Sequence, residues 1–168
     1  TVNCIVQDRQ GFVWMATKGG LNRFDGVGFR VFRTGNSALT TNFINTLAED
    51  RDGRLWVGTE RGVYSYNPWT ESLTPLTETI EGTQGRKVTC SVRSITVTDD
   101  GSILIGTTGE GVLRYDPAKR RLHCCWKELL PWSISHVSTS TDRIWVGAGG
   151  INLFCTYATD KPLTAFTD

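Results

Sequence analysis

The sequence lacks a long hydrophobic run and an excess of charge of either sign. No stretch approaches the roughly 18 consecutive apolar residues that a membrane helix needs. The 18 Lys and Arg residues against 17 Asp and Glu residues leave a formal net charge of +1. This balance argues against a basic nucleic-acid arm, an acidic tail and a polybasic membrane segment. Hydrophobic residues make up 39% of the 168 positions, which fits one globular domain and excludes a disordered chain.

Histidine is scarce, and cysteine pairs with metal-ligand spacing are missing. The only histidines, His123 and His136, stand in no Ser-His-Asp or metal-binding pattern. An odd number of cysteines without a C-x-x-C pair disfavours a zinc site and a closed disulfide framework. The five cysteines are Cys4, Cys90, Cys124, Cys125 and Cys155. We therefore expect no catalytic residue, no metal and no cofactor in this chain, and cysteines that stay unpaired.

Methionine occurs once, as Met15, and the first residue is Thr1. This start indicates a piece of a longer protein or a processed form. No signal peptide is present, and its absence excludes no cellular compartment.

Glycine and tryptophan, by contrast, are abundant, and they mark four copies of one phrase. Trp14, Trp56 and Trp145 each stand in a short apolar run that follows a turn, and Leu104 takes the same place in the remaining copy. These aligned positions are 42, 48 and 41 residues apart, so four copies fill the 168 residues. Each copy contains four short β-rich runs separated by turn residues, and none keeps a helical period.

This repeat predicts an all-β chain of four antiparallel, four-stranded sheets, which are the blades of a β-propeller. We expect the blades at residues 1–35, 41–77, 90–126 and 133–168. The tryptophans and Leu104 would fill the space between blades, whereas Trp69, Trp126 and Trp132 fall outside the repeat and should vary in exposure. Small residues at Ala16, Gly58 and Gly106 would let neighbouring sheets approach closely. The third strand of each blade would open on a turn glycine: Gly20, Gly62, Gly111 and Gly150.

The number of blades in the complete ring follows from the innermost runs. These runs carry Val2, Ile5, Ile44 and Leu47, which are large for a sharply tapered four-blade ring and suit about seven blades. Four blades of seven leave a bare apolar face at each end. We therefore expect the isolated chain to self-associate.

The copy from Asp8 to Gly26 reads Asp-x-x-Gly-Phe-x-Trp-x-x-Thr-x-x-Gly-Leu-Asn-Arg-Phe-Asp-Gly. It resembles the two-component-regulator propeller repeat, and residues 49–66 and 100–116 match the same pattern. The fourth copy, 134–166, is degenerate because it lacks the acidic turn and the Gly before its Trp strand. The motif is structural and carries no catalytic residue.

The resemblance implies the periplasmic sensor of a Bacteroidetes-type hybrid two-component system. In that family two seven-bladed propellers precede a β-sandwich, a membrane helix, a histidine kinase and a DNA-binding regulator. The parent chain would respond to glycan-derived oligosaccharides and control polysaccharide-utilisation genes. This segment would contact the remaining blades and the β-sandwich, would bind no nucleic acid itself, and would reach the membrane only through the parent chain.

Strand direction places the loops into each first strand and the turns between second and third strands on one side of the blades. Ligand sites on propellers commonly use this side. The candidate ligand-binding residues there, including those of the long loop from Thr77 to Ser91, are Lys18, Glu60, Arg61, Glu110, Arg86, Lys87 and Trp132. Two other functions stay open, namely a propeller enzyme that resembles the streptogramin lyases and a scaffold that binds nothing.

Overall fold

The computed structural model describes residues 1–130, 132–150 and 152–166. These residues form sixteen strands and one short 3₁₀ helix, η1 (Lys127–Leu129). The strands are β1 (Val2–Gln7), β2 (Val13–Thr17), β3 (Gly20–Phe24), β4 (Phe29–Phe32), β5 (Ile44–Glu49), β6 (Leu55–Thr59), β7 (Gly62–Asn67), β8 (Ser72–Pro75), β9 (Val92–Val97), β10 (Ile103–Thr107), β11 (Val112–Asp116), β12 (Arg121–Cys124), β13 (Ile134–Thr139), β14 (Ile144–Ala148), β15 (Asn152–Thr156) and β16 (Thr164–Phe166).

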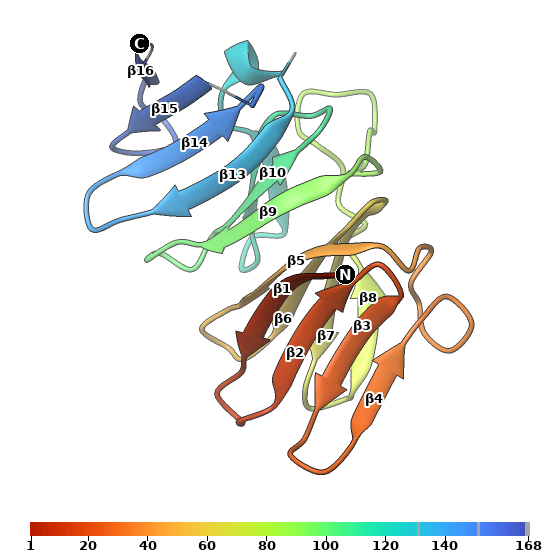
Figure 1. The fold of residues 1–168 in the computed structure, drawn as a ribbon. Coiled ribbons are helices and arrows are strands. Elements are labelled where there is room, and N and C mark those ends of the chain that lie inside the picture. Colours follow the sequence, from red (N-terminus) through yellow and green to blue (C-terminus); the bar gives the residue numbers. More distant parts are fainter. Residues whose placement is uncertain (131, 151, 167–168) are drawn as a thin grey trace.

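The strands pair into four antiparallel sheets of four strands, each in simple chain order. We call these sheets blades one to four. Figure 1 shows them following one another from the red N-terminus to the blue C-terminus. The predicted all-β architecture of four antiparallel blades is confirmed. Ile151, expected in a third strand, and residues 167–168 at the predicted end of blade four lie outside the described residues.

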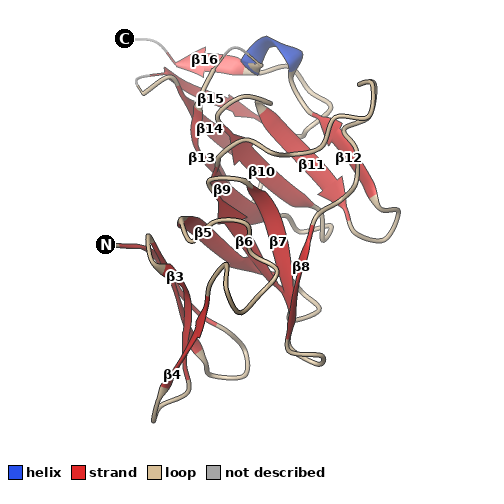
Figure 2. Cartoon of the chain, turned by 90° about the vertical axis from the view of Figure 1, so that its right-hand side faces the viewer, coloured by secondary structure: helices blue, strands red, loops and turns tan. Residues whose placement is uncertain are grey.

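The first strand of each blade lies on the inner side of an arc. Strand β1 contacts β5, β5 contacts β9, and β9 contacts β13. We call β1, β5, β9 and β13 the inner strands, and Figure 2 shows the sheets succeeding one another along the arc. The fourth strands lie at the outer edges. This order matches a propeller segment, in which short antiparallel sheets radiate from a central axis.

Adjacent blades bury one alternating row of side chains against the next sheet. Along β2, for example, Trp14 and Ala16 are buried while Val13, Met15 and Thr17 are partly exposed. Because successive strand residues point to opposite faces, one face of blade one meets blade two. We call the face that bears Trp14, Trp56, Leu104 or Trp145 the Trp face, and the other face the receiving face.

The joint between blades one and two shows how the Trp face packs. The Trp14 ring lies 4.7 Å from the Tyr66 ring, and Phe32 lies 5.6 Å from the same tyrosine. Leu55 and Val57 of the blade-two receiving face complete this apolar cluster. The same pattern recurs at the next joint, where Trp56 packs on Tyr115 at 5.5 Å. Burial of these side chains is the main force that holds neighbouring blades together.

In blades one and two, an aspartate six residues before the repeat tryptophan connects the turn to the joint. The Trp14 indole N–H donates to Asp8 Oδ2 at 2.6 Å, and that of Trp56 donates to Asp50 Oδ2 at 2.8 Å. The other oxygen of Asp8 accepts the backbone N–H groups of Gln10 and Phe12. One carboxylate thus holds a tight turn and fixes the orientation of the indole.

Two glycines allow the inner parts of the blades to approach. A Cβ atom on Gly58 would lie 2.5 Å from the Thr46 methyl and 2.8 Å from a Val92 methyl. One on Gly106 would lie 2.8 Å from an Ile134 methyl. Since β-branched side chains are stiff, little room could be made for an added methyl group. This is the close approach that the small residues predict.

The prediction that Trp145 is buried like Trp14 and Trp56 is wrong. Trp145 is only partly buried and packs on Phe166 at 5.8 Å, whereas Trp14 and Trp56 are 1% and 4% exposed. Its position in the sheet is equivalent, but it lies on the end face, where the arc supplies no fifth blade. The tryptophans outside the repeat vary as expected, from 4% exposed at Trp126 to 79% at Trp69.

The other end face carries an equally bare receiving surface. Ile5, on β1, is 62% exposed, while its equivalents Leu47, Ile95 and Val137 are 5%, 6% and 0% exposed. Each of these four residues pairs with the middle residue of the neighbouring second strand, so their registers are the same. The difference in exposure therefore reflects only the lack of a blade packed on blade one.

Candidate functional site

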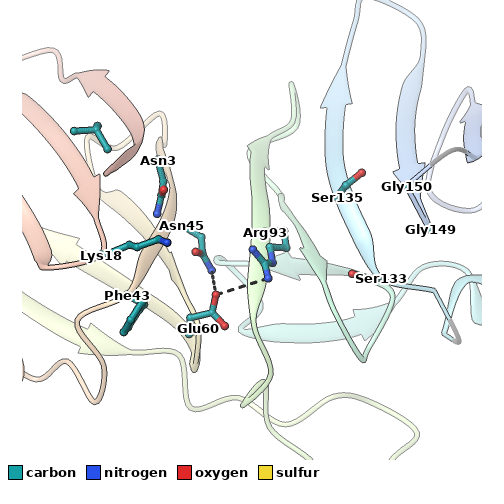
Figure 3. A pocket seen from close by; sticks show the side chains of 11 residues that line it. Asn3, Lys18, Phe43, Asn45, Glu60, Arg93, Ser133, Ser135, Gly149 and Gly150 are labelled. Carbon is teal, nitrogen blue, oxygen red and sulfur yellow. Dashed lines mark hydrogen bonds and ion pairs between the residues drawn. The ribbon is translucent and has the colours of Figure 1, made fainter.

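An open pocket of about 1060 Å³ lies on the inner side of the arc. We call it the inner pocket. It is built from the beginnings of the inner strands and from the turns that join second to third strands, which is the side that strand direction predicts. Figure 3 shows Asn45, Glu60 and Arg93 close together, with Ser133 and Ser135 farther along the arc. Its lining residues are Val2, Asn3, Lys18, Phe43, Asn45, Glu60, Arg93, Ser133, Ser135, Gly149 and Gly150.

A β-bulge at the same point of every inner strand supplies four of the lining residues. The register with the second strand shifts between Val2 and Cys4, and again between Ile44 and Thr46. Equivalent shifts occur in β9 and β13. A bulge leaves one residue without a partner across the ladder and redirects its side chain. The bulge residues are Asn3, Asn45, Arg93 and Ser135, and all four line the inner pocket.

The two asparagines tie adjacent blades together below the pocket. Asn3 Nδ2 donates to the Ile44 carbonyl at 2.7 Å, and Asn45 Nδ2 donates to the Val92 carbonyl at 3.1 Å. Asn45 Nδ2 also lies 3.2 Å from Glu60 Oε1. The pocket floor is thus fixed by hydrogen bonds that run from one inner strand to the next.

Three charged side chains face this floor. Glu60 Oε1 lies 3.8 Å from Arg93 Nη2, with side-chain exposures of 37% and 48%. Lys18 is exposed and forms no ion pair with any of the described residues. The inner pocket therefore carries two positive groups and one negative group, a surplus of one positive charge.

Phe43 adds an aromatic surface that the sequence reasoning missed. It lines the pocket just before β5 and is 47% exposed. Its backbone carbonyl accepts the Glu60 N–H at 3.1 Å, which places Phe43 next to the turn that carries Glu60. A half-exposed aromatic ring among polar groups can stack on a ligand while hydrogen bonds orient it.

The candidate residues of the sequence analysis divide into two sets. Lys18 and Glu60 line the inner pocket. Trp132 lies at its border, where the indole packs so closely on Gly149 that a Cβ there would lie 2.5 Å from the ring. Arg61 is exposed in the turn next to Glu60, outside the lining.

The long loop between blades two and three lies away from the inner pocket. Arg86 forms an ion pair with Glu110 at 3.2 Å, and the backbone of Lys87 forms an isolated antiparallel β-bridge with Thr79. Ile80 pairs with Leu122 of β12, at the outer edge of blade three. The loop therefore covers that edge, and Arg86, Lys87 and Glu110 lie outside the lining of the inner pocket.

Within the described residues, no group of three or more His, Cys, Asp or Glu side chains is placed to hold a metal ion. The histidines lie on different blades, His123 in β12 and His136 in β13. All five cysteines are free of disulfides. No described helix is both long enough and apolar enough to cross a membrane.

Similarity to known proteins supports the reading of the repeats. The family model of the two-component regulator propeller matches residues 1–19 and 38–61. No curated protein matches the sequence.

Solved structures share the fold over almost the whole chain. The extracellular domain assigned to the hybrid two-component system BT3049 of B. thetaiotaomicron is 24% identical with a TM-score of 0.81, covering 99% of this chain and 24% of that one. The extracellular domain assigned to BT4673 of the same organism is 19% identical with a TM-score of 0.81, covering 97% and 22%. Virginiamycin B lyase of Staphylococcus aureus is 11% identical with a TM-score of 0.75, covering 99% and 55%.

The chain spans about a quarter of the length of the two Bacteroides domains. Its four sheets follow their propeller fold, and its first two blades contain the segments that the family model matches. Residues 1–19 and 38–61 therefore match the two-component regulator propeller repeat, as the sequence predicts, and the chain shares the propeller fold.

Proposed function

We propose that this chain is the ligand-sensing propeller segment of a periplasmic hybrid two-component sensor, and that it binds a glycan-derived oligosaccharide in the inner pocket. The parent protein would transmit binding through a histidine kinase to polysaccharide-utilisation genes. The observation that carries the proposal is the exposed ring of Phe43 beside the polar bulge residues. Sugar rings have apolar C–H faces and polar hydroxyl edges, and this pocket offers a complement to both.

The surrounding architecture supports the same function. Repeats of the two-component-regulator kind and a fold shared with two extracellular Bacteroides domains favour an extracytoplasmic sensor. Four sheets that correspond to 55% of the Staphylococcus lyase chain imply about seven in a ring of that size. We propose that the remaining blades and the β-sandwich of the parent chain complete the sensor and place it at the membrane.

A lyase is the competing function, because the fold is shared with virginiamycin B lyase. An acid–base reaction would need a titratable group with a suitable pKa in the pocket. Of the described lining residues, those with charged side chains are Lys18, Glu60 and Arg93, and none of the lining residues is a histidine. This composition favours binding over catalysis.

Calorimetric titration of the chain with a panel of glycan-derived oligosaccharides tests the proposal. We expect one class to bind, and Phe43→Ala to weaken its affinity about tenfold through loss of the stacked surface. Phe29→Ala is the matched control, because Phe29 is also exposed but lies at the outer edge of blade one. Absence of binding by every oligosaccharide, or equal affinity in the wild type and Phe43→Ala, would contradict a sugar site in the inner pocket.

A further inference from the structure

The bulge residues occupy one structural position in four blades, and blade three departs from blades one and two. Asn3 and Asn45 use their side-chain nitrogens to hold the backbone of the next inner strand. At this position β9 carries Arg93, whose guanidinium extends toward Glu60 of blade two. Figure 3 shows it among the groups that face the pocket. An arginine here thus adds charge to the pocket instead of repeating the asparagine bond.

Glu60 leaves most of the Arg93 hydrogen-bonding capacity unused. A guanidinium has five N–H donors in a planar fork, which matches a carboxylate or sulfate group when two donors engage it. The contact between Arg93 and Glu60 is a single one of 3.8 Å, and the Glu60 oxygen involved also lies 3.2 Å from Asn45 Nδ2. With 48% of its side chain exposed, Arg93 keeps donors directed to solvent in the pocket.

Lys18 adds a second positive charge from blade one. It lines the same pocket, it is exposed, and no described residue pairs with it. A ligand that carries negative charge would therefore meet a surplus of positive charge, fixed on two different blades.

We propose that the inner pocket selects an acidic oligosaccharide, with Arg93 as the principal ligand of its carboxylate or sulfate group and Lys18 as a supporting charge. This inference rests on the proposed function and names its substrate class. The bulge makes Arg93 the specificity-determining position, because the bulge aims its side chain into the pocket without disturbing the pairing of β9 on either side.

The test is a titration of the chain with three sets of oligosaccharides: uronic-acid oligomers, sulfated oligomers with an uncharged backbone, and neutral oligomers. We expect binding from one of the two acidic sets, and which set binds distinguishes carboxylate from sulfate. Arg93→Asn should weaken that binding at least about tenfold, since hydrogen bonds to charged groups are among the strongest. Binding should also weaken as salt rises from about 0.05 to 0.5 M.

Three variants and the salt series keep the result interpretable. Arg93→Asn introduces the residue that blades one and two already carry at this bulge, so we expect it to fold. Lys18→Thr introduces the residue that blade three carries at the equivalent turn position, Thr108, and should weaken binding less. Arg51→Asn is the control, because Arg51 pairs with Asp99 in the turns at the opposite end of the sheets. If Arg93→Asn fails to fold, the salt dependence of the wild type still decides between an acidic and a neutral ligand, and Lys18→Thr still tests the positive charge of the pocket.

The outcomes separate this inference from the function on which it rests. Binding by a neutral oligosaccharide that neither salt nor Arg93→Asn changes would overturn the acidic class and leave the sugar site standing. Absence of binding by all three sets would overturn both. Equal weakening by Arg93→Asn and Arg51→Asn would show a general charge effect, and would overturn the assigned role of Arg93.

Discussion

A hydrogen bond between an aspartate and a tryptophan lets two residues fix the packing of a whole joint between blades. In blades one and two the aspartate accepts turn amides with one oxygen and the indole with the other. In blade three Thr98 and Leu104 take these places, and Thr98 holds its turn through Ser102. The turn residue and the joint residue therefore differ together between blades. An aspartate buried beside a leucine would keep one oxygen without a hydrogen-bond donor.

The first prediction compares two tryptophans in the same repeat position. Trp56→Ala should lower the free energy of unfolding by about 3–5 kcal/mol, because it opens a cavity at a closed joint and leaves Asp50 without its partner. Trp145→Ala should cost about 1 kcal/mol, since that ring is only partly buried. Urea unfolding followed by fluorescence measures both, and similar losses for the two variants would contradict the difference in packing.

Asp100 should make the stability of the fold depend on pH in the acidic range. Burial alone would raise the pKa of Asp100, but hydrogen bonds from Thr98 and Ser102 and the charge of Arg114 together lower that pKa from 3.8 to about 2. A carboxyl whose pKa is lower in the folded state stabilises the fold above its unfolded pKa, and this contribution is lost as pH falls. We expect stability to decline from about pH 4 to about pH 2, and Asp100→Asn to flatten part of this decline.

The measurement is the urea midpoint as a function of pH for the wild type and Asp100→Asn. Asp99→Asn is the control, because Asp99 is the more exposed neighbour in the same turn. An identical pH profile in the wild type and Asp100→Asn would remove Asp100 from the acid response.

At the scale of the strand, the turn glycines that open the third strands do more than supply a bend. Gly62 has φ near 90°, and a Cβ there would lie 2.5 Å from the Val88 carbonyl oxygen. Gly101, in the turn before β10, has a similar φ of 82° but no atom within 4 Å of an added Cβ. The first glycine is required by backbone conformation and by space, and the second by conformation alone.

We therefore predict that Gly62→Ala destabilises the chain clearly more than Gly101→Ala. The latter should cost about 1–2 kcal/mol through the left-handed backbone alone. The former must also displace the loop segment around Val88, which precedes β9. Thermal unfolding of the two variants gives the comparison, and equal losses would show that the contact with Val88 is relaxed at little cost.

The strands and their order could be predicted from the sequence, because a turn, a short apolar strand and a glycine turn recur in four copies, with Trp in three of the strands and Leu104 in the other. Lys18 and Glu60 could be placed on the pocket side because antiparallel strands fix which turns share an end. The bulges could not, since a bulge inserts one residue without changing the pattern of apolar residues that marks a strand. Arg93 was missed for this reason, although Asn3, Asn45, Arg93 and Ser135 all stand second in their strands. Phe43 lies just before β5, outside the repeated phrase, so no repeat pattern marked it.

Long-range packing explains the remaining differences. The loop after β8 carries charged residues that suit a binding loop, but Arg86 and Glu110 pair with each other, and Ile80 anchors the loop to blade three. Likewise, the local phrase around Trp145 matches its counterparts, while its burial depends on a neighbouring blade. A local sequence pattern predicts neither an ion pair between distant residues nor the presence of a neighbouring blade.

At the scale of the whole molecule, the two end faces are the two halves of one joint. Blade four presents a Trp face with Trp145, Leu153 and Phe166, the last two 41% and 48% exposed. Blade one presents a receiving face with Ile5 and Phe29, 62% and 64% exposed. Two copies joined head to tail at both ends would bring together eight blades, within the usual range of four to eight.

We predict that the isolated chain self-associates at micromolar concentration, with a mass above 18.6 kDa by light scattering. Ile5→Asp should reduce the association without unfolding the chain, because this side chain faces solvent in the single copy. Lys127→Asp is the control, because η1 packs through Leu129 in the cluster between blades three and four, a joint that is closed in the single copy. A stable mass of 18.6 kDa with no binding of an apolar dye would show that the end faces need no partner.

The joints between blades differ in strength, and this difference should set the order in which the blades open. A row of units that contact only their neighbours opens from its weakest end, and each unit closes or opens nearly as one. Blade one packs on blade two through three aromatic rings, and Asp8 fixes the indole among them by a hydrogen bond within blade one, while blade four has no acidic turn. Backbone amides of β14 and β15 should therefore exchange with deuterium first and those of β6 and β10 last. A ligand held between Lys18 and Arg93 would slow amide exchange in the middle blades. Exchange in blade four would keep the rate that it has without ligand.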